Sequence, residues 1–171
     1  MAISLPFFTG LISSLIGISL PGLLNMTAAK ICIQEGKTRA FVFALGAIVI
    51  IFLQTFISIM FAKFLNNNPD ITMLFREIGL GIFLTLTFYF FWTSKKMTIR
   101  ERDVKLKSKR SRFFLGLLLS AINLFPIPYY VFVSVTLASY DYFTFDLTST
   151  SIFVFGSGVG AFIAFYCYIA F

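Results

Sequence analysis

Two short clusters of uncharged polar residues lie beside prolines, inside stretches that are otherwise apolar. The residues that could contact a ligand are Ser19, Pro21, Gly22 and Asn25 in the first cluster, and Asn123, Pro126 and Tyr129 in the second. A proline inside a helix removes an N–H group and leaves carbonyl groups of the preceding turn without helical partners. Hydroxyl, amide and backbone groups of this kind can hydrogen-bond a small polar molecule without the burial of an unpaired charge.

Gln54 is a further uncharged polar residue in an apolar stretch. It either hydrogen-bonds a neighbouring helix or lines a solute path. The chain has no His, and Cys32 and Cys167 form no CxxC pair, so the spacing of metal ligands is missing. No Ser or Cys has a neighbouring base that could activate it as a nucleophile. The sequence therefore predicts no metal site, no cofactor and no enzyme activity.

The charged residues leave five long gaps, which predict membrane-spanning helices. No charge occurs in 1–29, 40–62, 78–94, 113–140 or 147–171, and 58% of the chain is hydrophobic. A helix needs about 20 residues to cross a hydrocarbon core of about 30 Å, and lipid-exposed backbone must satisfy its own hydrogen bonds. We therefore predict an all-α integral membrane protein with spans at about 5–29, 40–62, 74–94, 113–138 and 147–171.

The loops between these spans differ in charge. Residues 95–112 hold nine basic and two acidic residues, whereas 141–146 hold only Asp141 and Asp146. Basic loops remain cytoplasmic, so we expect loop 95–112 inside and the N-terminus outside. This loop can also contact anionic lipid headgroups. It has no interleaved aromatic residues, so nucleic acid is not an expected partner.

Part of the sequence recurs. FFTGLISS at 7–14 returns as FFLGLLLS at 113–120 with five of eight positions identical, and FVF with a following glycine recurs at 41–46 and 153–158. Chance recurrence in a chain with 24 Phe is the alternative. Three spans separate the copies, so the second copy would be inverted. We predict one unit at 1–94, a basic loop at 95–112 and a second unit at 113–171, which would lack a sixth helix near 190–206.

Three stretches, GISLPGLLN, EGKTRAFVFALG and FFLGLLLSAINLFPIPYY, resemble the lysine exporter (LysE/RhtB) family of amino-acid effluxers. Leu23 replaces the second proline of the family's Pro-Gly-Pro signature, and Phe125 replaces the Asn of its Asn-Pro. The resemblance implies export of amino acids or related small zwitterions across the bacterial inner membrane by alternating access. The lipid bilayer and a small solute are the implied partners. The GxxxG spacing of Gly156 and Gly160 fits packing in the bundle or in a homo-oligomer.

One departure supports an alternative function. Family members often carry a Gly-Asp pair near the place of Ile50 and Ile51, and the predicted spans contain no charged residue apart from Arg76 and Glu77 at the start of span 74–94. An ionisable group inside the membrane is the usual mark of a proton relay or of a charged-substrate site. The alternative is a non-transporting membrane subunit or scaffold that kept the fold and lost its coupling residues. The Pro-Gly break at residues 21–22 favours transport instead.

Overall fold

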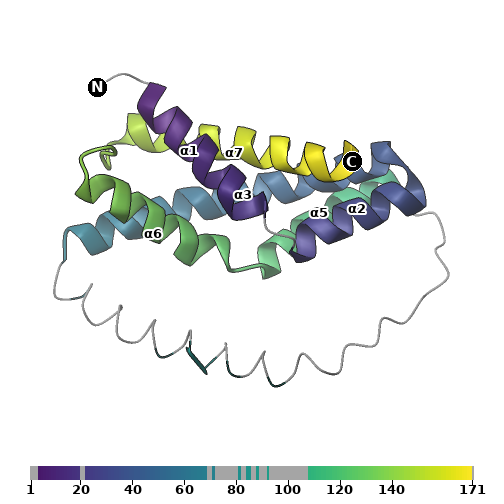
Figure 1. The fold of residues 1–171 in the computed structure, drawn as a ribbon, viewed down its shortest axis with the longest axis horizontal. Coiled ribbons are helices and arrows are strands. Elements are labelled where there is room, and N and C mark those ends of the chain that lie inside the picture. The colour runs from purple at the N-terminus through teal and green to yellow at the C-terminus, as the bar shows by residue number, and fades with distance from the viewer. Residues whose placement is uncertain are drawn as a thin grey trace. The chain divides into compact units, whose positions relative to one another are not determined.

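The computed structural model describes residues 4–19, 22–68, 71, 81, 84, 85, 88, 92 and 108–170. These residues form helices and no strands, which confirms the all-α class. The helices are α1 (Ser4–Ser19), α2 (Leu23–Glu35), α3 (Lys37–Asn66), α5 (Lys109–Ile122), α6 (Pro126–Ser139) and α7 (Leu147–Ala170) (Figure 1). The chain divides into one unit of residues 1–63 with 106–171 and another of residues 64–105. The described residues between 71 and 92, in the second unit, are helical.

Two helices are each long and apolar enough to cross a membrane, namely α3 and α7. The pairs α1 with α2 and α5 with α6 are two further candidate spans, bent at their breaks by 72° and 61°. Two to four spans among the described residues indicate a membrane protein. The predicted span at 74–94 lies almost wholly outside the described residues.

The helix ends differ from the predicted boundaries. Helix α2 continues past residue 29 to Glu35, and α5 begins at Lys109, inside the segment predicted as the basic loop. The charged ends of these helices extend beyond the charge-free gaps because a helix can continue where its side chains reach water or a charged partner. Pro21 lies outside the described residues, but α1 ends at Ser19 and α2 begins at Leu23 on either side of it.

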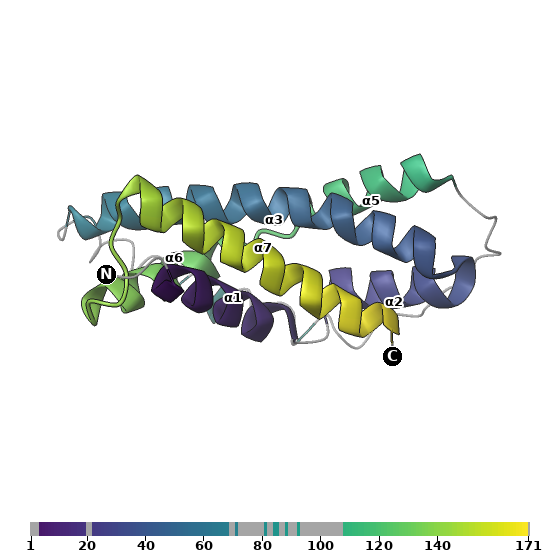
Figure 2. The ribbon, with the colours of Figure 1, turned by 90° about the horizontal axis from the view of Figure 1, so that it is seen from above.

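The two bent helix pairs, α1 with α2 and α5 with α6, run in opposite directions through the structural unit formed by residues 1–63 and 106–171. Helix α1 leads from one end toward the middle and α2 continues to the other end, while α5 and α6 return (Figures 1 and 2). The corner between α2 and α3 lies beside the start of α5. We call this the basic end, defined by residues 30–39 and 108–112. The acidic end is defined by residues 140–146, between α6 and α7.

Helices α1 and α5 bury and expose matching residues. Each buries one residue in every four, and the buried residues are Pro6, Gly10 and Ser14 in α1 and Arg112, Gly116 and Ser120 in α5. The opposite faces carry exposed apolar side chains, which are Phe8, Ile12 and Ile16 in α1 and Phe114, Leu118 and Ile122 in α5. Every buried or exposed residue in α1 has its counterpart 106 positions later. An exposed apolar face of this kind suits contact with lipid.

Helices α1 and α7 cross with their backbones in contact. A methyl group on Gly10 would overlap the carbonyl oxygen of Phe153, and one on Gly156 would overlap the carbonyl oxygen of Phe7. Glycine is needed at both positions because only a residue without a side chain allows this approach.

Helices α5 and α3 cross in the same way. A methyl group on Gly116 would overlap the carbonyl oxygen of Phe43, and one on Gly46 would overlap that of Phe113. Each of the four glycines follows a phenylalanine by three positions, and the two crossings use corresponding residues of α1 and α5.

The crossings correct the register of the second sequence echo. The echo aligns Gly46 with Gly158, but the contacts align Gly46 with Gly156, two residues earlier. Gly158 faces the ring of Phe52 instead of a helix backbone. Gly160 packs against α1 at Leu11, so Gly156 and Gly160 both serve packing inside the bundle.

Candidate functional site

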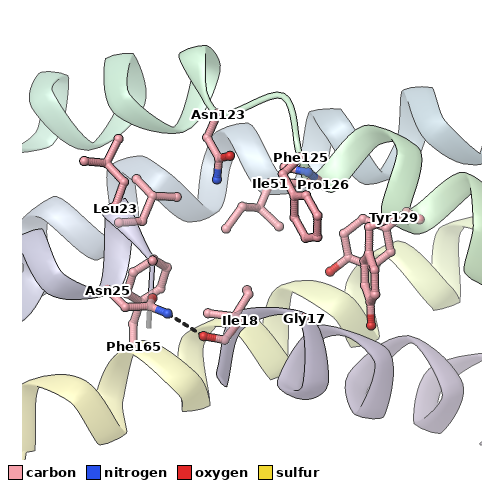
Figure 3. A pocket seen from close by; sticks show the side chains of 13 residues that line it. Gly17, Ile18, Leu23, Asn25, Ile51, Asn123, Phe125, Pro126, Tyr129 and Phe165 are labelled. Carbon is pink, nitrogen blue, oxygen red and sulfur yellow. Dashed lines mark hydrogen bonds between the residues drawn. The ribbon is translucent and has the colours of Figure 1, made fainter. Parts of the chain in front are cut away.

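A cavity of about 240 Å³ lies where the two breaks meet (Figure 3). The end of α1, the start of α2, the end of α5 and the start of α6 line it, and α3 and α7 complete the wall. The predicted site residues that the cavity brings together are Gly22, Asn25, Asn123, Pro126 and Tyr129. Residues from two clusters about a hundred positions apart in the sequence thus share one space.

The other predicted site residues do not line this cavity. Ser19 is exposed, and its hydroxyl donates to the carbonyl of Leu15 one turn earlier in α1. Pro21 lies outside the described residues. Gln54 is buried in α3 and is not among the residues that line the cavity.

Two side chains satisfy carbonyl groups at the end of α1. The amide nitrogen of Asn25 donates to the carbonyl of Ile18, and the Tyr168 hydroxyl donates to the carbonyl of Ser19 at 2.8 Å. These carbonyls belong to the last turn, which has no helical donors of its own. Asn25 therefore stabilises the first break as well as lining the cavity.

Gln54 has the corresponding role at the second break. Its amide nitrogen donates to the carbonyl of Ser120 at 3.1 Å and to that of Asn123 at 2.9 Å. Both carbonyls lie at the end of α5, where the helix stops before Pro126. This geometry favours contact between helices over path lining, which were the two roles that the sequence left open for Gln54.

Aromatic rings form one side of the cavity. The rings of Phe125 and Tyr129 stack with centroids 6.1 Å apart and an interplanar angle of 19°. The Tyr129 hydroxyl donates to the carbonyl of Ser13 at 2.7 Å, and its ring packs on Gly17, so Tyr129 joins α6 to α1. The described residues that line the cavity include no charged side chain.

The start of α2 is the most electropositive backbone facing the cavity. Gly22 caps α2 without a side-chain hydrogen bond, and residues 22–25 all line the cavity. The first turn of a helix carries N–H groups without helical partners and a partial positive charge. The start of α6 offers fewer donors because Pro126 and Pro128 have no N–H and the Ile127 N–H bonds to Leu124. An anionic group would therefore bind at α2 in preference to α6.

A buried ion pair lies at the basic end and was not predicted. The Arg112 Nε donates to Glu35 Oε2 at 2.8 Å, and Nη2 contacts Oε1. The side chains of Arg112 and Glu35 are 10% and 0% exposed. The sequence places both residues in predicted loops. The sequence repeat aligns Arg112 with Pro6, which carries no charge, so the repeat gave no signal for an ion pair at this position.

Comparison of the chain with protein-family models, curated proteins and solved structures found no match. The resemblance to the lysine exporter family therefore depends on the sequence motifs alone. Within the described part of the chain, no group of three or more His, Cys, Asp and Glu side chains could hold a metal ion.

Proposed function

We propose that this protein is a transporter that exports amino acids or related small zwitterions across the bacterial inner membrane. The observation that carries the proposal is that two broken helices contribute uncharged polar residues to one cavity. Membrane transporters commonly build the solute site where discontinuous helices meet. The motif resemblance to the lysine exporter family supplies the substrate class.

The proposal includes an inverted relation between the predicted units 1–94 and 113–171, which would open the cavity to one side of the membrane and then to the other. Its support is an exchange relation between the helix contacts. Exchanging α1 with α5 and α3 with α7 turns the α1–α7 glycine crossing into the α5–α3 crossing. The same exchange, with α2 for α6, relates the α2–α5 contact to the α6–α1 contact. In a protein with such a two-fold relation, the two halves can exchange conformations, and the cavity then opens to the other side of the membrane.

A zwitterion suits the cavity because its two charges have different partners there. The carboxylate would lie at the start of α2, beside Asn25. The ammonium would lie against the stacked rings of Phe125 and Tyr129, as cations do on aromatic faces. A cavity of about 240 Å³ has room for a small solute in place of several water molecules.

A scaffold without transport activity is the second candidate. Asn25, Gln54 and Tyr168 already hydrogen-bond carbonyls at the breaks, and the described residues that line the cavity include no charged side chain. These contacts would stabilise two kinked helices even if no solute ever bound.

An efflux assay separates the two candidates. Proteoliposomes containing the purified protein and loaded with a panel of labelled amino acids should release at least one of them faster than protein-free liposomes under an imposed proton gradient. The variant Asn25→Leu with Asn123→Leu, reconstituted at equal density, is the matched control and should release less. Wild-type protein that releases none of the panel would favour the scaffold.

A further inference from the structure

We propose that Glu35 and Arg112 form a gate that closes the route to the cavity from the basic end. The inference rests on the proposed transport function, because a gate is needed only where access alternates. It assigns a function to the buried ion pair, which the substrate site itself does not use.

The pair lies at the far ends of the two half-helices that lead to the cavity. Helix α2 leads from Asn25 at the cavity wall to Glu35, and α5 leads from Arg112 to its C-cap Asn123 at the same wall. Ten or eleven residues at 1.5 Å per residue place the pair about 15 Å from the cavity along each helix. The ion pair therefore ties α2 to α5 across the basic end.

The tie is a strong one. Two parallel N–H···O contacts join the guanidinium to the carboxylate, and this bidentate geometry gives the strongest side-chain hydrogen bonds. Both side chains are shielded from water, which reduces screening of their attraction. Arg39 donates to the backbone carbonyl of Glu35 at 3.0 Å and so fixes the same corner.

The corresponding position toward the acidic end carries no charge. Exchanging α1 with α5 and α2 with α6 relates the α2–α5 contact to the α6–α1 contact, and the residue of α1 that corresponds to Arg112 is Pro6. The hydrogen bond from the Tyr129 hydroxyl to the carbonyl of Ser13, which joins α6 to α1, lies at the cavity. An ion pair thus ties the half-helices at the basic end, whereas Pro6 cannot form one at the corresponding position of α1. Separation of α2 from α5 requires the charges to part, so the pair biases the protein toward closure at the basic end.

Accessibility of a cysteine in the cavity tests the gate. Leu24→Cys lines the cavity and would be introduced into a protein with Cys32→Ser and Cys167→Ser. The vesicle orientation that exposes the basic end is identified beforehand by labelling Arg110→Cys. The rate of reaction with a membrane-impermeant thiol reagent is then measured in vesicles of both orientations. The test variant is Glu35→Gln with Arg112→Gln, which removes the ionic tie without leaving a buried charge alone.

The expected result is faster labelling from the basic end, by about tenfold, which corresponds to a population shift of about 1.4 kcal/mol. Labelling from the acidic end should fall. Lys109→Gln, which removes an exposed charge one turn away on α5, should label as the wild type does. The exchange Glu35→Arg with Arg112→Glu should return the rate only part of the way to the wild-type value, because Arg39 lies beside residue 35 and would repel the new arginine.

Three outcomes would overturn the proposal in distinguishable ways. If the cavity cysteine is labelled from either end in the wild-type background and the neutral variant is labelled at the same rates, the gate is refuted but alternating access is not. Faster labelling from both ends would indicate a loosened fold rather than a gate. No labelling of any variant from either end would refute both the gate and alternating access.

Discussion

Gly46 of α3 and Gly116 of α5 face each other across a crossing at which the two helix backbones touch. A methyl group on Gly46 would overlap the carbonyl of Phe113, and one on Gly116 would overlap that of Phe43. Neither carbonyl belongs to a flexible side chain that could move aside. The crossing therefore fixes how closely α5 can approach α3.

We predict that Gly116→Ala destabilises the protein by about 1–3 kcal/mol, the usual cost of overpacking a tight contact. Thermal unfolding of the purified protein in detergent would measure the loss. Gly81→Ala is the matched control, because Gly81 is helical and no atom of the described residues lies within 4 Å of the position of its missing side chain. That change should be neutral or stabilising, by up to about 1 kcal/mol of helix propensity. Equal effects of the two changes would contradict the crossing.

Gln54→Leu should also destabilise the protein, by about 1–3 kcal/mol, because it removes the donor to two carbonyls at the end of α5. Ser58→Ala is its control on the same helix. Ser58 is fully buried, but its hydroxyl donates to the Gln54 carbonyl within α3 and to no other described residue, so its loss should cost less. Chemical or thermal unfolding of both variants would rank them, and a larger cost for Ser58→Ala would be evidence against this role of Gln54.

The sequence alone indicated five of the residues that line the cavity, namely Gly22, Asn25, Asn123, Pro126 and Tyr129, because their signals are local. Proline and glycine break a helix wherever they occur in it, so the positions of the two breaks follow from residues 21–22 and 126. Polar residues beside a break are then expected to face one another if the breaks meet. Asn25, Asn123 and Tyr129 meet this expectation in the cavity.

The contacts that the sequence did not predict depend on distant partners. Glu35 and Arg112 are 77 positions apart, and nothing local in their segments distinguishes a buried ion pair from two loop charges. The register of α7 was ambiguous for a similar reason. Its GSGVG segment offers three glycines, and only contact with α1 identifies Gly156 as the counterpart of Gly46. Gln54 could be placed as a buried amide, but its partners depend on how α3 packs against α5.

The Asp146 carboxylate at the start of α7 gives a pH-dependent prediction. Hydrogen bonds from the Thr144 hydroxyl and the Ser149 N–H hold the pKa of Asp146 well below its ordinary value of 3.8. A lowered pKa in the folded state stabilises the protein above pH 3.8, and this stabilisation is lost as the pH falls further. Wild-type protein should therefore unfold at a slightly higher Tm than Asp146→Asn at pH 7, with the difference shrinking below pH 4. A constant difference between pH 7 and pH 3 would exclude a contribution from the charge.

Topology can be tested with two single-cysteine variants in the background of Cys32→Ser and Cys167→Ser. The charge difference between loops 95–112 and 141–146 predicts that Lys107→Cys faces the cytoplasm and Asp141→Cys faces outward. In intact cells, an impermeant thiol reagent should label the cysteine at position 141 and spare that at 107 until the membrane is permeabilised. The reverse pattern would show that the orientation is inverted.

Asn123 provides the sharpest test of the substrate site. Its side chain points toward the cavity (Figure 3), and the hydrogen bonds that it makes to other described residues involve its backbone. Asn123→Leu therefore removes amide groups from the cavity while leaving the Gln54 contact at the break intact. Loss of one or two hydrogen bonds to a solute should weaken its affinity by about 1–3 kcal/mol, or about 5- to 150-fold, with little change in Tm. Asn25→Leu should lower both affinity and Tm, because Asn25 also donates to the carbonyl of Ile18. Concentration-dependent efflux and thermal unfolding of the two variants would separate these effects. Equal transport by wild type and Asn123→Leu would leave export possible but would remove Asn123 from its site.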